Sequence, residues 1–264
     1  ADKKGGETYL LKSLIDTGAV DATKAKNLTE KIENYRALTR ATDAVDSVSQ
    51  DTNSLTQARG TVQYAGDTMD VSFDSSTREK IVLRNGKVQL SSETKITQNG
   101  ETTESGTWIK DGGVTAKNKV AVDDSMTDAD LAEVESNQVD KVGLSAIKSI
   151  SVVKDGLTSY YSVDVDASAA AFLSGILENY VDEDDKDLTS IEVSDIKVTY
   201  TVNGQGVLGA MTTSFRLKIV YASGEFQGDP MVMDMKYTVA TNILATGNAV
   251  SITFPDFSDY VILN

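Results

Sequence analysis

The chain has 264 residues, of which 40% are hydrophobic and 25% are charged, the usual composition of a globular domain. Its formal net charge of −15 repels phosphate backbones and so argues against nucleic-acid binding. It contains no cysteine and no histidine, which excludes disulfides, Cys/His zinc sites and every triad with an imidazole base. No stretch approaches the ~20 apolar residues of a membrane span.

The beginning of the chain, Ala1 to Gly6, is polar and lacks an initiator methionine. We interpret it as the start of a mature chain from which a signal segment has been removed. The expected location is therefore extracytoplasmic.

The segment 1–52 is predicted to be helical and to pack on the rest of the protein. A first helix is expected from Glu7 to Ile15, with Gly18 as a stop signal. Asp21 can cap a second, longer helix. The apolar residues of that second helix recur every three or four positions and form one buried stripe: Leu28, Ile32, Tyr35, Leu38, Ala41, Val45 and Val48.

After residues 50–53 the hydrophobic period changes from the helical value to two, which is typical of strands. Asn85-Gly86 and Asn99-Gly100 each separate two alternating segments, and Asn-Gly is the strongest short hairpin signal. Residues 111–113 (Asp-Gly-Gly) turn the chain again. The region up to about residue 119 is therefore predicted to be an antiparallel meander.

The middle of the chain mixes helices with strands. Residues 123–138 are predicted to be an acidic loop entering a short helix, near 126–138. Strands are expected over 147–153 and 160–165. A further helix is expected over 168–180, with its apolar side chains on one face: Phe172, Leu173, Ile176, Leu177 and Tyr180.

The last third predicts three long strands in which apolar and polar residues alternate. Their apolar positions are Ile196, Val198, Tyr200 and Val202; then Phe215, Leu217, Ile219 and Tyr221; then Met231, Met233, Met235, Tyr237 and Val239. A final strand is predicted from Val250 to Phe254, ending at Pro255. Strands with one apolar and one charged side form a sheet that is solvated on one side.

These elements predict an α+β fold dominated by β-structure, with a segment 53–264 that forms one curved antiparallel sheet. A twisted sheet of about eleven strands should curl into a half-barrel. The predicted helices are the elements long enough to cover its concave face. Residues 61–119 and 191–254 are both meanders, so an internal duplication is conceivable, although no fixed-period match links them.

The motifs that could carry chemistry are weak. The acidic run 181–187 has the charge for calcium but neither the ligand spacing nor the glycine of a calcium loop. Ser145-x-x-Lys148 and Ser151-x-x-Lys154 match a serine–lysine pattern that chance alone produces, without its partner motifs. A glycosidase would need aromatic platforms, and the chain has one tryptophan. We therefore expect no enzyme, no cofactor and no metal.

The methionine stripe Met231, Met233 and Met235 suggests an adaptable apolar surface, because methionine is flexible and polarisable. The simpler interpretation is ordinary core beneath a helix. If it lines a ligand cavity, the expected ligand-binding residues are these three with Tyr200, Phe215, Leu217, Ile219 and Tyr237 from the strands and Phe172 and Ile176 from the covering helix.

The order of elements resembles the LolA/LolB/LppX-like superfamily, particularly uncharacterised lipoproteins of Gram-positive bacteria. The resemblance spans about residues 25–258 and rests on the segments Trp-Ile-Lys-Asp-Gly (108–112), Met-Val-Met-Asp-Met-Lys-Tyr-Thr (231–238) and Val-Ser-Ile-Thr-Phe-Pro (250–255). It implies a half-barrel with a helical lid and a cavity for an acyl chain. It also implies anchoring to the outer face of the membrane through a lipidated cysteine upstream of Ala1.

Two functions follow as hypotheses. The first is a non-catalytic cell-envelope protein that binds or carries a lipid or another apolar molecule between sheet and helices. The second is a surface interaction or structural module whose core is filled and which holds no ligand. The volume between sheet and helices separates the two, and sequence does not provide it.

Overall fold

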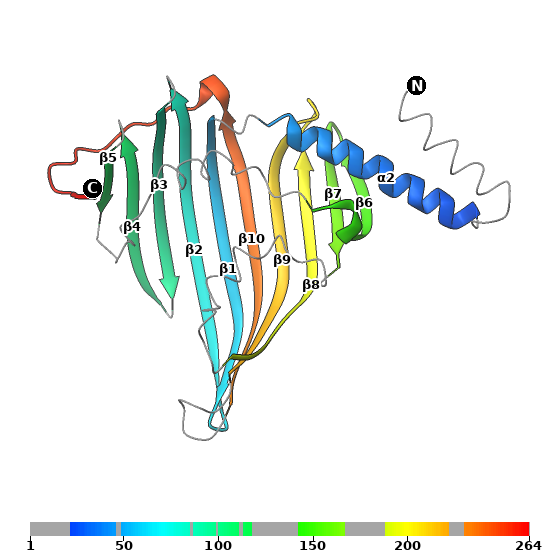
Figure 1. The fold of residues 1–264 in the computed structure, drawn as a ribbon, viewed down its shortest axis with the longest axis horizontal. Helices are drawn as coiled ribbons and strands as arrows, with labels where there is room; N and C mark the ends of the chain where they lie inside the picture. Colours follow the sequence, from blue (N-terminus) through cyan, green and yellow to red (C-terminus); the bar gives the residue numbers. More distant parts are fainter. Residues whose placement is uncertain are drawn as a thin grey trace.

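The fold is taken from a computed structural model that describes residues 22–45, 49–84, 87–98, 100–110, 113–117, 142–166, 188–221 and 230–263. The expected helices over 7–15, 126–138 and 168–180, the acidic run 181–187, and Val48 lie outside the described residues. Among those described, the protein is one open, half-barrel-like antiparallel sheet of eleven strands with one α-helix (Figure 1). The predicted β-dominated class and the strand number are confirmed.

The sheet consists of two meanders that meet at their first and last strands. In spatial order the strands are β11-β5-β4-β3-β2-β1-β10-β9-β8-β7-β6, so β1 of the first meander pairs with β10 of the second. Their bounds are β1 Ser49–Tyr64, β2 Asp67–Arg84, β3 Lys87–Gln98, β4 Glu101–Lys110, β5 Gly113–Lys117, β6 Ile147–Asp155, β7 Thr158–Val165, β8 Leu188–Val202, β9 Leu208–Tyr221, β10 Met231–Thr246 and β11 Val261–Leu263.

The hairpins form where the turn signals place them. β2 and β3 pair in register up to Arg84 and Lys87, on either side of Asn85-Gly86. β3 and β4 pair up to Gln98 and Glu101, and Gly100 has the positive φ of 86° that a tight turn requires. Two short 3₁₀ helices, η1 (Leu144–Ala146) and η3 (Gly247–Ala249), lie before β6 and after β10.

The two sides of the sheet differ in chemistry. Directly paired residues of an antiparallel ladder point to the same side. We call the side that carries Phe215, Leu217 and Ile219 the apolar face, and the side that carries Arg216 and Asp234 the charged face. Among the described residues, ion pairs on the charged face join neighbouring strands: Arg59–Asp74, Arg78–Asp51, Lys95–Glu104 and Arg216–Asp234.

A bulge in β8 keeps its apolar side chains on one side. Opposite Phe215, β8 carries two residues, because its register with β9 shifts between Ser194 and Lys197. Asp195 in this bulge has a φ of 54°. The apolar positions are odd-numbered before the bulge (Ile191, Val193) and even-numbered after it (Ile196 onward), so both halves of the strand face the same core.

Helix α2 (Ala22–Asp43) packs against one end of the apolar face, on β6 and β8 (Figure 1). Leu38 and Ala41 enter the main core with Val45, which follows the helix, so most of the predicted helical stripe is confirmed. Leu28, near its other end, is 45% exposed. Of the helices expected to cover the concave face, α2 is the one described, and it reaches only the β6–β8 end.

Two sequence-based boundaries are corrected. The ladder of β1 begins at Ser49, ahead of the predicted change at 50–53. The predicted strand from Val250 to Phe254 is wrong, because residues 250–260 belong to no strand. This C-terminal segment packs on the charged face instead: the Trp108 ring lies 5.2 Å from the Tyr260 ring and 6.1 Å from the Phe257 ring. The chain then adds the short edge strand β11 to β5.

Candidate functional site

Three rows of apolar side chains cross the apolar face at right angles to the strands. The register places each row on five neighbouring strands, β8, β9, β10, β1 and β2. The first row is Ile191, Ile219, Met233, Val62 and Met69; the second is Val193, Leu217, Met235, Gly60 and Val71; the third is Ile196, Phe215, Tyr237, Ala58 and Phe73. The rows unite the two meanders in one apolar surface.

In each row the residue on β2 is less buried than the residue on β9. Leu217 and Ile219 on β9 are completely buried, whereas Met233 and Val62 are half-buried. Met69, at the β2 end of the first row, is 59% exposed. An exposed methionine next to half-buried apolar neighbours is an open end of a hydrophobic surface, and such surfaces mark sites of interaction.

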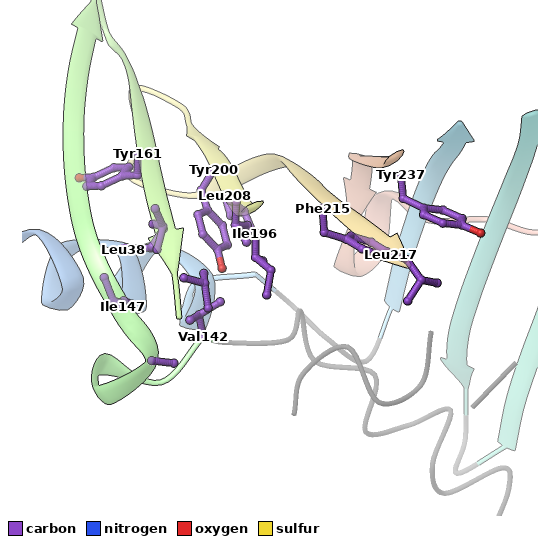
Figure 2. Close-up of a cluster of buried hydrophobic side chains, with 14 of the residues drawn as sticks. Leu38, Val142, Ile147, Tyr161, Ile196, Tyr200, Leu208, Phe215, Leu217 and Tyr237 are labelled. Atoms are coloured by element: carbon purple, nitrogen blue, oxygen red, sulfur yellow. The ribbon is translucent and has the colours of Figure 1, made fainter. Parts of the chain in front are cut away.

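The middle of the surface is held by close packing. Phe215 and Tyr237 stack with their ring centroids 5.1 Å apart and an interplanar angle of 7° (Figure 2). The side chain of Met235 occupies the space beside Gly60 where another residue would carry its Cβ. A Cβ at position 60 would be 2.8 Å from the Met235 sulfur. Glycine at this crossing therefore lets β1 and β10 approach each other closely.

The eight predicted ligand-binding residues that the structure describes all lie on the apolar face. Six are buried: Tyr200, Phe215, Leu217, Ile219, Met235 and Tyr237. Met231 and Met233 are half-buried. Phe172 and Ile176 lie outside the described residues. The prediction missed the β1 and β2 ends of the rows, such as Val62 and Phe73, although their alternating pattern was visible.

The space between α2 and the sheet is filled. Tyr35, Leu38 and Thr42 of the helix face Val163 and Tyr200 of the sheet across a crevice of about 10 Å³ (Figure 2 shows Leu38 and Tyr200). This is room for one water molecule at most. A ligand of acyl-chain size does not fit beneath α2, so the open part of the apolar face is the β10–β1–β2 end.

The carboxyl group of Glu79 interrupts the apolar face. Glu79 on β2 lies on that face, opposite Thr52 of β1 and Ser92 of β3, and burial raises its pKa. On the charged face the opposite shift occurs: hydrogen bonds from Arg216 hold the pKa of Asp234 below its usual range. The pKa of Glu79 rises because its half-buried carboxyl has no cationic partner among the described residues, and the pKa of Asp234 falls because its solvated carboxyl is ion-paired.

The described residues hold no group of three or more potential metal ligands. Ser151 and Lys154 both lie on the exposed strand β6, where the geometry of a helical Ser-x-x-Lys motif does not form. Within the same part of the chain, no helix has both the length and the apolar character to cross a membrane.

A second hollow lies on the charged face. It has a volume of about 500 Å³ and is lined by residues of β1 to β5 and of the C-terminal segment. The sequence predicted no site from these residues, although Trp108 and the segment 250–255 carried the family resemblance. The strand residues of the lining alternate with the apolar side chains, and this alternation does not by itself indicate a hollow.

No protein-family model matches this chain, and no curated protein sequence matches it significantly.

Proposed function

We propose that the protein binds or carries a lipid or another hydrophobic molecule on the apolar face, without catalysing a reaction. The observation that carries the proposal is the partly open apolar surface of β10, β1 and β2, where Met231, Met233 and Met69 meet Val62 and Val71. Flexible methionine side chains adapt to apolar ligands of variable shape. An acyl chain lying across the strands would cover side chains that now contact water.

The rest of the proposal follows the sequence resemblance. A LolA-like cell-envelope lipoprotein, held at the outer face of the membrane by a lipid anchor upstream of Ala1, would present such a surface to membrane lipids. The net charge of −15 keeps the remaining surface away from anionic head groups, so the apolar face would make the productive contact. The alternative is an interaction module without a ligand, and the filled crevice beneath α2 favours it.

Titration of the purified protein with an environment-sensitive fluorescent fatty acid tests the proposal. The variant Met69→Asp places a carboxylate at the open end of the first row, where the parent side chain is 59% exposed, so stability should change little. An unpaired charge against an acyl chain is costly, and we expect at least a ~10-fold increase in Kd.

The matched control is Leu157→Asp, in the turn between β6 and β7. Leu157 is 84% exposed and lies away from the three rows. This variant should bind the probe as the parent protein does. Absence of saturable binding by the parent protein, or equal loss in both variants, would support the ligand-free interaction module.

A further inference from the structure

The groove on the charged face lies on the opposite side of the sheet from the apolar surface. Its volume of about 500 Å³ is in the range of small-ligand sites. One wall is the sheet, with the basic residues Arg78, Lys95 and Lys117 and the acidic residues Glu93 and Glu104. The other is the C-terminal segment, which contributes Phe254 and Tyr260 and is fixed to the sheet by its packing on Trp108.

The strand register places two charges on either side of the Trp108 ring. Glu93 of β3 and Lys117 of β5 both pair with Gly106 of β4. The indole lies over Gly106, because a Cβ at that position would be 2.2 Å from the six-membered ring. Two strand spacings separate Glu93 from Lys117, so their Cα atoms are about 10 Å apart.

Most charges of the groove are already neutralised. Arg78 is ion-paired with Asp51 at 2.7 Å, and Lys95 with Glu104 at 3.6 Å. Glu93 and Lys117, by contrast, are exposed and form no ion pair or hydrogen bond in the described structure. The groove therefore offers one unpaired anion and one unpaired cation.

Between these two charges lies the six-membered ring of the Trp108 indole, over Gly106. Trp108 lines the groove and is 4% exposed, and its Nε1 is buried without a hydrogen-bond partner in the described part of the protein. The groove therefore has an aromatic surface between the anion and the cation.

We propose that this groove binds a short zwitterionic peptide of about three residues. Its ammonium group would pair with Glu93, its carboxylate with Lys117, and its backbone would lie across the Trp108 ring between them. An extended chain advances about 3.3 Å per residue, so a tripeptide spans the ~10 Å between the two charges. The proposal is independent of lipid binding on the apolar face.

Trp108 is the only tryptophan of the chain, so its fluorescence reports on the groove directly. We expect saturable binding of Ala-Ala-Ala to the full chain, seen by Trp108 fluorescence and by calorimetry. The N-acetylated, C-amidated tripeptide should bind at least about 10-fold more weakly, because it lacks both charges. Glu93→Gln and Lys117→Gln should each weaken binding of the free tripeptide by a similar factor.

The reversed pair Glu93→Lys/Lys117→Glu should restore binding, since a zwitterion can enter in the opposite direction. Glu192→Gln and Lys236→Gln, on the charged face outside the groove, are the matched controls and should leave the affinity unchanged. No binding up to about 10 mM peptide, equal affinity for the capped peptide, or no recovery in the reversed pair would each overturn the proposal.

Discussion

The close approach of β1 and β10 at Gly60 makes a sharp prediction about stability. A methyl group on Gly60 would lie 2.0 Å from the carbonyl oxygen of Asp234 and 2.8 Å from the Cα of Met235. Both atoms belong to the backbone, so the strands would have to separate by about 1 Å to restore van der Waals distances. Overpacking costs about 1–3 kcal/mol, and one or two weakened ladder hydrogen bonds cost about 1 kcal/mol each.

We therefore expect Gly60→Ala to lower the free energy of unfolding by about 2–5 kcal/mol. In a chain of this size this corresponds to a fall in Tm of about 4–20 °C, measured by circular dichroism and checked by urea unfolding. The matched control is Gly209→Ala on β9, where the nearest atom to a new Cβ is 3.8 Å away. It should leave Tm unchanged or raise it slightly. If both variants melt together with the parent protein, β1 and β10 are not joined as described.

Three further predictions concern the core and the carboxyl groups of Asp234 and Glu79, whose pKa values are shifted in opposite directions. Leu217→Ala removes a completely buried side chain and should cost about 2–5 kcal/mol in urea unfolding; a loss below about 1 kcal/mol would place Leu217 outside the core. Hydrogen bonds from Arg216 lower the pKa of Asp234, which stabilises the protein above the unfolded-state pKa; this stabilisation is lost as pH falls through the folded-state pKa. Asp234→Asn should therefore lower Tm modestly at pH 7 and make Tm fall less steeply in acid. An unchanged acid part of the Tm–pH profile would contradict this. Burial raises the pKa of Glu79, so the protein loses stability as pH rises through the unfolded-state pKa of this carboxyl. Glu79→Gln should therefore raise Tm at pH 7, and this gain should disappear near pH 4. A gain in Tm that does not depend on pH would point to another cause.

Local signals in the sequence predicted the strands well. The Asn-Gly pairs at 85–86 and 99–100 lie between paired strands, and the long alternating segments of the last third became β8, β9 and β10. A hairpin depends on a few adjacent residues, which explains why period and turn chemistry sufficed. The eight strand residues expected to line a ligand site share one face for the same reason.

Non-local packing was not predictable in this way. Val250 to Phe254 alternate as a strand would, yet they leave the sheet because Phe257 and Tyr260 pack on Trp108, far away in the sequence. β1 pairs with β10 although the two strands are about 180 residues apart in the sequence. This pairing places Val62 and Phe73 in the same apolar rows as the residues of β8, β9 and β10. Likewise, Glu93 and Lys117 flank one tryptophan only once the register of β3, β4 and β5 is known.

Binding of a hydrophobic ligand to the partly open apolar face can be measured by native mass spectrometry of the protein incubated with oleate, beside the variant Met69→Asp. We expect the parent protein to carry the mass of one bound fatty acid above its own 28.3 kDa, and the variant to lose this adduct. The bare mass alone for both proteins, at saturating oleate, would refute ligand binding on this face and favour an interaction module without a ligand.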